Sequence, residues 1–231
     1  MSFQQKVDVY GLAEANKLII QSTTGGETAT NVEAIGEDGS IVANVVCGEI
    51  ANPSCQMKLK SSITRTAGQW KIGGVSSFNS KKFALEKISI STSAGAAPSI
   101  SASGKQVNDD AATGCYYPVP AFELTTKHHA QILFSAFTLS GTGCHLTGAS
   151  YEIGGTVNPV TIDAYPIAFD VVQGKITVSI SIKQCGSVTP TLTPGDGFII
   201  TTPLASSNPD AEYPTYSATL TKYLTKSEAA S

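Results

Sequence analysis

The stretch Lys175-Ile176-Thr177-Val178-Ser179-Ile180-Ser181-Ile182-Lys183 alternates apolar and hydroxyl side chains along its whole length. Neighbouring residues of a β-strand point to opposite faces, so Ile and Val share one face while Thr and Ser share the other. The pattern therefore predicts a long strand that is buried on one side only. Its second side carries hydroxyl groups where a solvent-facing strand more often carries charges.

Similar alternation recurs at residues 55–60, 88–91 and 100–103. The small residues and proline between the last two segments predict a turn, so residues 87–103 are expected to form a β-hairpin. Further strands are predicted at residues 18–21, 41–49, 69–72, 137–140, 149–153, 167–172, 198–202 and 218–223. Turn residues separate them at Gly25-Gly26, Asp38-Gly39, Gly73-Gly74, Gly154-Gly155 and Pro194-Gly195-Asp196-Gly197.

One segment departs from this period of two. Between residues 126 and 137 the apolar residues Ala130, Leu133, Phe134 and Phe137 are spaced three, one and three apart, as on one face of a helix. Thr125 or Thr126 could cap its first turn. The predicted fold is all-β, an antiparallel β-sandwich or barrel with one short packed α-helix at about 126–137. A single domain spans residues 1–231, with polar N- and C-terminal arms.

The composition agrees with a β protein of low charge. Of the 231 residues, 51 are Ser or Thr and only 14% are charged, against a usual value of about 25%. The hydrophobic fraction of 41% argues against a fully disordered chain. Charge is sorted along the sequence: residues 1–57 carry −5, residues 58–105 carry +7 and residues 106–231 carry −5. This order could form complementary faces between copies, or it could balance within one chain.

The sequence also gives an expectation for the cellular compartment in which the protein folds. The first twenty residues lack the uninterrupted apolar run of a secretory signal, and no run is long enough for a membrane helix. The number of cysteines is odd, and none has a Cys-x-x-Cys spacing. We expect reduced, partly buried thiols and assembly in a reducing cytoplasm. The five cysteines are Cys47, Cys55, Cys115, Cys144 and Cys185.

No motif predicts a catalytic, cofactor or metal site. Adjacent His128 and His129 lack the i, i+4 spacing of a helical metal site. A dyad of Cys144 with His129 would need the fold to bring them together. Asp109-Asp110 reads as a solvated turn, because the alternating oxygen ligands of a calcium loop do not follow.

The single tryptophan and the single arginine bear on two kinds of binding function, carbohydrate binding and nucleic-acid recognition. Trp70 is the only tryptophan, and we expect it in the core because a carbohydrate-binding surface usually shows several exposed aromatics. Arg65 is the only arginine, which argues against sequence-specific nucleic-acid recognition. The basic segment 58–105 leaves nonspecific contact with phosphates open.

In its layout the chain resembles bacteriophage virion structural proteins, most specifically tail-tube subunits. The resemblance rests on chain length, alternating strands, the expected helix at 126–137, the hairpin at 87–103 and the polar arms. It implies copies of a β-barrel or sandwich whose sheets join into rings, usually hexameric, and rings that stack around a lumen conducting DNA. It implies other virion proteins as further partners. The basic segment departs from the usually acidic lumen and would face other subunits or the exterior.

On this basis we predict that the hairpin and the polar loop at residues 206–214 form an assembly interface with the next ring. Its residues are Lys87, Ser93, Gly95, Pro98, Ser103, Asn208, Asp210 and Tyr213. The alternatives are another virion component (a capsid decoration, tail-terminator or baseplate protein), an extracellular β-sandwich binding module and, last, an enzyme.

Overall fold

The computed structural model describes residues 2–5, 8–14, 17–35, 41–78, 80–107, 114–162 and 165–227. Within them the chain forms antiparallel β-strands and loops and no helix, so the all-β prediction is confirmed. The predicted turn at Asp38-Gly39 and the pair Asp109-Asp110 lie outside the described residues. So do residues 228–231 of the polar C-terminal arm.

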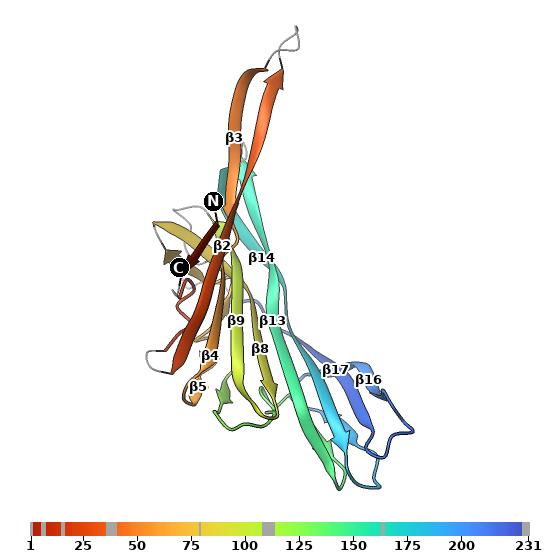
Figure 1. The fold of residues 1–231 in the computed structure, drawn as a ribbon. Helices are drawn as coiled ribbons and strands as arrows, with labels where there is room; N and C mark the ends of the chain where they lie inside the picture. Colours follow the sequence, from red (N-terminus) through yellow and green to blue (C-terminus); the bar gives the residue numbers. More distant parts are fainter. Residues whose placement is uncertain are drawn as a thin grey trace.

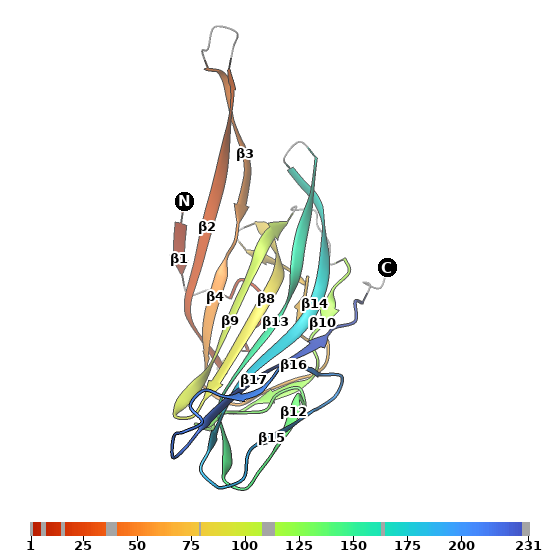
Figure 2. The same cartoon turned by 90° about the vertical axis from the view of Figure 1, so that its right-hand side faces the viewer.

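An 11-stranded antiparallel sheet is the main feature of the fold (Figure 2). Its strands run in the spatial order β1 (Ser2–Gln5), β2 (Leu18–Ile35), β4 (Ser54–Leu59), β9 (Ala96–Val107), β8 (Lys81–Ser93), β13 (Cys144–Ile162), β14 (Tyr165–Gln184), β17 (Thr215–Tyr223) and β16 (Ile199–Ser206). Two more strands lie off this path, β3 (Ile41–Ala51) paired with β2 and β7 (Val75–Phe78) paired with β8. The described strands form no closed barrel, so the barrel prediction is wrong.

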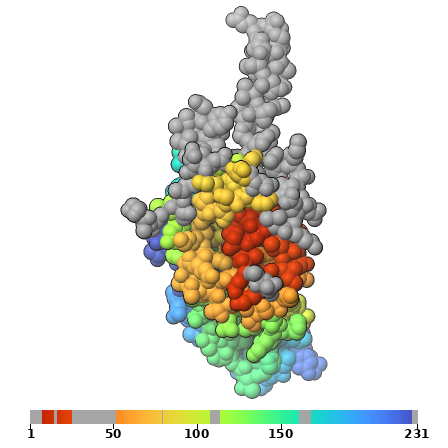
Figure 3. Space-filling view, turned by 90° about the vertical axis from the view of Figure 1, so that its left-hand side faces the viewer, coloured from red at the N-terminus to blue at the C-terminus, as the bar shows by residue number. Residues whose placement is uncertain are grey.

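Three short strand pairs form a separate layer: β5 (Ile63–Arg65) with β11 (Phe122–Leu124), β6 (Lys71–Ile72) with β10 (Tyr117–Pro118), and β12 (Phe137–Ser140) with β15 (Thr191–Pro194). Their apolar side chains join the same core as those of the large sheet. Together with the segment around residues 8–14 they cover one face of the sheet, the face seen in Figure 3.

A row of aromatic rings links this covering layer to the sheet. Trp70 packs on Phe122, Phe122 on Phe134 and Phe134 on Tyr151, with ring centroids 5.2, 5.2 and 5.7 Å apart. Such tilted contacts add to the hydrophobic gain of burial. Trp70 is 3% exposed, which confirms its predicted place in the core.

The predicted hairpin at residues 87–103 is confirmed and is longer than expected. Strands β8 and β9 pair from Lys82↔Val107 to Ser93↔Ala96, so the turn shrinks to Ala94 and Gly95. Gly95 has φ +81°, a conformation that favours glycine. The register shifts between Ser91 and Ser93, opposite Pro98, which has no N–H to donate to the ladder.

The helix predicted at residues 126–137 is wrong. Ala130, Leu133, Phe134 and Phe137 are buried as expected, but the chain reaches the core as an irregular loop followed by a turn. Phe134 and Ser135 have φ of 60° and 49°, which a right-handed helix does not allow.

The sheet itself supplies the hydrogen bonds that a helix would have made. The Gln131 N–H donates to Thr92 Oγ1 (3.3 Å), and the Leu133 N–H donates to the Tyr151 hydroxyl (3.0 Å). The Gln131 side chain accepts from the Thr125 N–H (3.0 Å) and donates to the Thr125 carbonyl (2.6 Å). Because these partners satisfy the buried backbone, apolar spacing alone does not impose a helix here.

Two glycine pairs predicted as turns lie inside strands instead. Gly25-Gly26 belongs to β2, and Gly154-Gly155 belongs to β13, where the register with β14 shifts between Gly154 and Thr156. Strands β2 and β13 are therefore much longer than predicted. The hairpins β2–β3 and β13–β14 extend beyond the rest of the sheet at one end of the molecule (Figures 1 and 2).

Candidate assembly surfaces

The face of the sheet opposite the covering layer carries rows of hydroxyl side chains. The register places six of them at one level, one on each of six neighbouring strands from β9 to β16: Ser99, Ser91, Ser150, Ser179, Thr219 and Thr202. Each is half-buried or exposed, and for the five on β9, β8, β13, β14 and β17 the residue before or after it is in the core. We call this surface the hydroxyl face.

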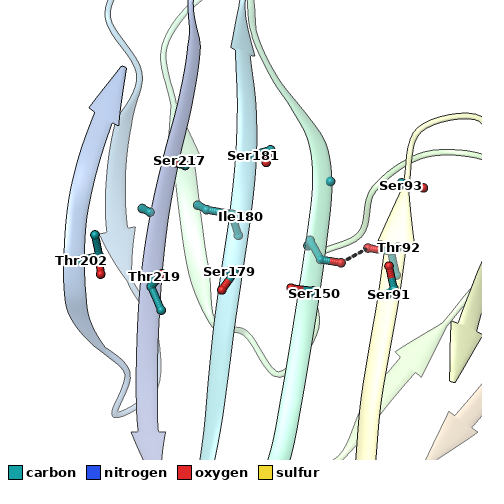
Figure 4. Close-up of a pocket in the computed structure, with 13 residues that line it drawn as sticks. Ser91, Thr92, Ser93, Ser150, Ser179, Ile180, Ser181, Thr202, Ser217 and Thr219 are labelled. Atoms are coloured by element: carbon teal, nitrogen blue, oxygen red, sulfur yellow. Dashed lines mark hydrogen bonds between the residues drawn. The ribbon is translucent and has the colours of Figure 1, made fainter. Parts of the chain in front are cut away.

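A shallow hollow of about 360 Å³ lies on the hydroxyl face (Figure 4). Ser93, Ser181 and Ser217 extend its lining beyond the row, and Gly148 leaves space beside them. None of its lining residues is a titratable side chain. A serine without a neighbouring base is not an activated nucleophile, so this lining offers hydrogen bonds to a partner rather than catalysis.

A band of charged residues borders these hydroxyl rows. Lys87 on β8 forms an ion pair with Glu152 on β13 (2.7 Å), and Lys175 lies beside them on β14. Lys87 pairs with Ser103 across the β8–β9 hairpin. These two residues of the predicted interface therefore lie within the sheet, away from the hairpin turn.

The other three hairpin residues of the prediction lie at or near the turn. Ser93 borders the hollow, Gly95 forms the turn and Pro98 is buried. The turn is fixed to the body, because the Ala94 N–H donates to the Thr147 carbonyl (2.9 Å) and the Gly95 N–H donates to the His128 carbonyl (3.0 Å).

The polar loop joins β16 to β17 at the edge of the sheet and comprises residues 207–214. We call it the acidic loop, because Asp210 and Glu212 are its only charged residues. Asn208 shapes it by accepting hydrogen bonds, from the Thr215 N–H at Oδ1 (2.9 Å) and from the Ala211 N–H at its carbonyl (3.1 Å). Tyr213 is 45% exposed, and Lys183 Nζ lies 5.9 Å from its ring centre.

The structure thus brings the acidic loop and the hairpin turn to the same end of the sheet. The row of Ser93, Gly148, Ser181, Ser217 and Ala205 connects them from strand to strand.

The sequence did not reveal the edges of the sheet. In the described residues no strand pairs with the outer side of β16, and Ile199 and Ile200 on it are 52% and 39% exposed. At the opposite edge β1 pairs with β2 only from Thr23 onward, which leaves the outer side of Leu18–Ser22 without a strand partner in the described chain. Ile19 there is 45% exposed. The strands were predicted, but their neighbours depend on the whole topology.

The only arginine is part of the covering layer. Arg65 is 5% exposed; its Nη1 donates to Glu14 Oε2 (2.9 Å), its Nη2 donates to the Leu12 carbonyl (3.1 Å), and its guanidinium lies 5.3 Å from the centre of the Trp70 ring. A hydrogen bond from Lys17, together with the charges of Lys17 and Arg65, lowers the pKa of Glu14. These contacts fasten the segment around residues 8–14 to β5.

No group of three or more His, Cys, Asp or Glu side chains in the described chain is arranged to hold a metal ion. Cys115, Cys144 and Cys185 are free thiols, and the Cys144 thiol donates to the Val188 carbonyl (3.4 Å). Cys55 is buried, which raises the pKa of its thiol.

No protein-family model and no curated protein matches the chain. Since the described residues form no helix, none of them provides a helix that could span a bilayer.

Proposed function

We propose that the protein is a structural subunit that assembles with copies of itself, as a tail-tube protein of a bacteriophage virion. One observation carries the proposal: an open sheet ends in an edge strand, β16, that exposes Ile199 and Ile200. Unpaired edges invite pairing with another chain, and proteins that remain monomeric usually blunt them. In an assembly that joins edge to edge, these isoleucines leave water.

The one-sided covering layer supports a ring. In the ring we propose, the covering layer adds width on the outer side and the bare face of the sheet lies inward. In this proposal the hydroxyl face lines the lumen. Most of its side chains are hydroxyl groups; Lys58 and Lys175 also lie on it, and Lys87 is paired with Glu152. Such a surface gives passing DNA few fixed phosphate contacts. Assembly in a host cytoplasm and incorporation into the virion complete the proposal.

The test is assembly of the purified protein, followed by sedimentation velocity and negative-stain microscopy. Wild type is expected to form rings or tubes. The double variant Ile199→Lys/Ile200→Lys should remain monomeric, because edge lysines oppose pairing. Ile132→Lys is a matched control: Ile132 is 44% exposed but lies in the loop before β12.

A wild-type protein that stays monomeric up to high concentration would contradict the proposal. So would assembly of the edge variant at the wild-type concentration. Single rings that never stack would favour another virion component, such as a tail terminator.

A further inference from the structure

The direction of the strands decides which edges can meet. From β2 to β16 each strand is antiparallel to the next, in the order β2, β4, β9, β8, β13, β14, β17, β16. With eight strands in this path, β16 runs opposite to β2. A second copy in the same orientation would therefore place its β2 antiparallel to β16 of the first, and the sheet would continue with the same face outward.

The register decides which residues lie at the same level. The row that contains Thr202 on β16 continues through the sheet to Ser99, Lys58 and finally Ile19 on β2. Joined at this level, Thr202 of one copy lies beside Ile19 of the next. Ile199 and Ile200 then lie beside the residues that follow Ile19 on β2. The rows place Ile200 level with Ile20 and Ile199 level with Ser22, so the apolar contact across the seam is between Ile200 and Ile20.

The backbone ladder at this seam is short. The register of β16 with β17 shifts on both sides of Thr202, and Pro203 has no N–H to donate. Pairing is confined to the first half of β16, residues 199–202. Side chains must then fix the register of the seam.

Opposite charges stand at the same end of the two edges. Past Thr202 the chain enters the acidic loop, with Asp210 and Glu212. At the same end of the other edge β4 finishes beside Lys17, whose carbonyl accepts from the Lys60 N–H (2.8 Å). Lys58 and Lys60 are exposed there. Among the described residues neither these two lysines nor the two acids form an ion pair.

We infer that copies join head to tail, with β16 of one copy against the outer side of β2 of the next, and that Asp210 and Glu212 lie against Lys58 and Lys60 of that neighbour. This rests on the proposed function and names its partner surface. It places the acidic loop against a neighbour in the same ring, whereas the sequence suggested a contact with the next ring. Charge complementarity of this kind favours one register and one neighbour over others.

Charge reversal tests the seam. The lysine variant is Lys58→Glu/Lys60→Glu, and the loop variant is Asp210→Lys/Glu212→Lys. Either alone places like charges across the seam and should raise the concentration needed for assembly about tenfold. Lys175→Glu on the same face and Glu123→Lys in the covering layer are the matched controls and should assemble as wild type does. Urea unfolding of each variant shows whether its subunit remains folded.

Mixing the two variants is the decisive measurement. In the lysine variant the residues beside β2 are acidic and fit the basic loop of the loop variant. The acidic loop of the lysine variant in turn fits Lys58 and Lys60 of the loop variant. An equimolar mixture should therefore assemble in alternation, near the concentration at which wild type assembles. This rescue requires contact between two chains, which a folding defect could not mimic. Assembly should also weaken with added salt, because exposed pairs are screened.

Normal assembly of either variant alone, or a mixture that stays dispersed, would overturn the seam and leave the proposed function intact. Isolated rings of the loop variant would also overturn it, in favour of a contact between stacked rings. A wild-type protein that never assembles would overturn the proposed function and the seam together.

Discussion

The two faces of the large sheet are made by the same strands and differ almost completely. On β14, Ile176, Val178, Ile180 and Ile182 are at most 2% exposed under the covering layer. Between them Thr177, Ser179 and Ser181 line the other face, where no second layer of the described chain lies. Stability therefore depends on one face, while the second is free to serve contact with a partner.

The largest expected effect is a truncation on the covered face. Ile180→Ala removes buried methyl groups and leaves a cavity, which typically costs about 2–5 kcal/mol. Urea unfolding followed by circular dichroism measures this loss in the free energy of unfolding.

Its neighbour in the sequence provides the matched control. Ser179→Ala on the hydroxyl face should change the stability of the subunit by no more than about 0.5 kcal/mol. Equal losses at residues 179 and 180 would show that the hydroxyl face is as tightly packed as the covered face.

A smaller effect is expected where the covering loop is hydrogen-bonded to the sheet. Tyr151→Phe keeps the ring contact with Phe134 but removes the hydroxyl that accepts from Leu133 and donates to the Gln131 carbonyl (2.5 Å). Buried polar groups left without a partner cost about 1–3 kcal/mol. The loss should appear in urea unfolding and in the near-UV circular dichroism of the aromatic row.

A wild-type unfolding curve for Tyr151→Phe would mean that the loop replaces these bonds at no cost. Burial raises the pKa of Tyr151, so this hydroxyl stays protonated and its bonds should not vary with pH between 5 and 9.

The smallest effect is expected at the Glu14 ion pairs with Arg65 and Lys17, which are partly exposed and screened by solvent. The folded state lowers the pKa of Glu14 below its ordinary 4.5. The pairs therefore stabilise the fold fully above that value, and the contribution is lost as pH falls through the lower, folded pKa.

Wild type should thus be slightly more stable than Glu14→Gln at pH 7, and the two unfolding midpoints should converge in acid. Glu123→Gln, in the neighbouring β11, is the control. A difference that grows as pH falls would have the wrong sign for a lowered pKa.

The sequence predicted well wherever a local pattern coincides with burial. The alternation at residues 175–183 identified β14 and its hydroxyl side, and the hairpin at 87–103 was recognised from two such runs around a turn. The helix at 126–137 failed because its apolar spacing also suits a loop that Thr92 and Tyr151 hold by hydrogen bonds. Those partners are distant in sequence, so no local pattern reveals them.

The candidate surfaces divide in the same way. Asp210 and Tyr213 were identified as loop residues, and the basic segment that contains Lys58 was visible in the charge order. The sequence did not show that the loop and the basic segment could face each other across a seam, because separation along the chain does not reveal which strands become the edges of the sheet. Ile19 and Ile199 became candidates only once β2 and β16 were found at the two edges.

By itself the sequence determined that this chain makes long strands with one apolar and one hydroxyl face, because side chains alternate along any extended backbone. Only the tertiary structure decided that a single layer covers the apolar face, that the sheet stays open, and which strands end it. These features depend on strand register and on hydrogen bonds between segments far apart in the chain. The pairing of each strand is set by how all the other strands pack.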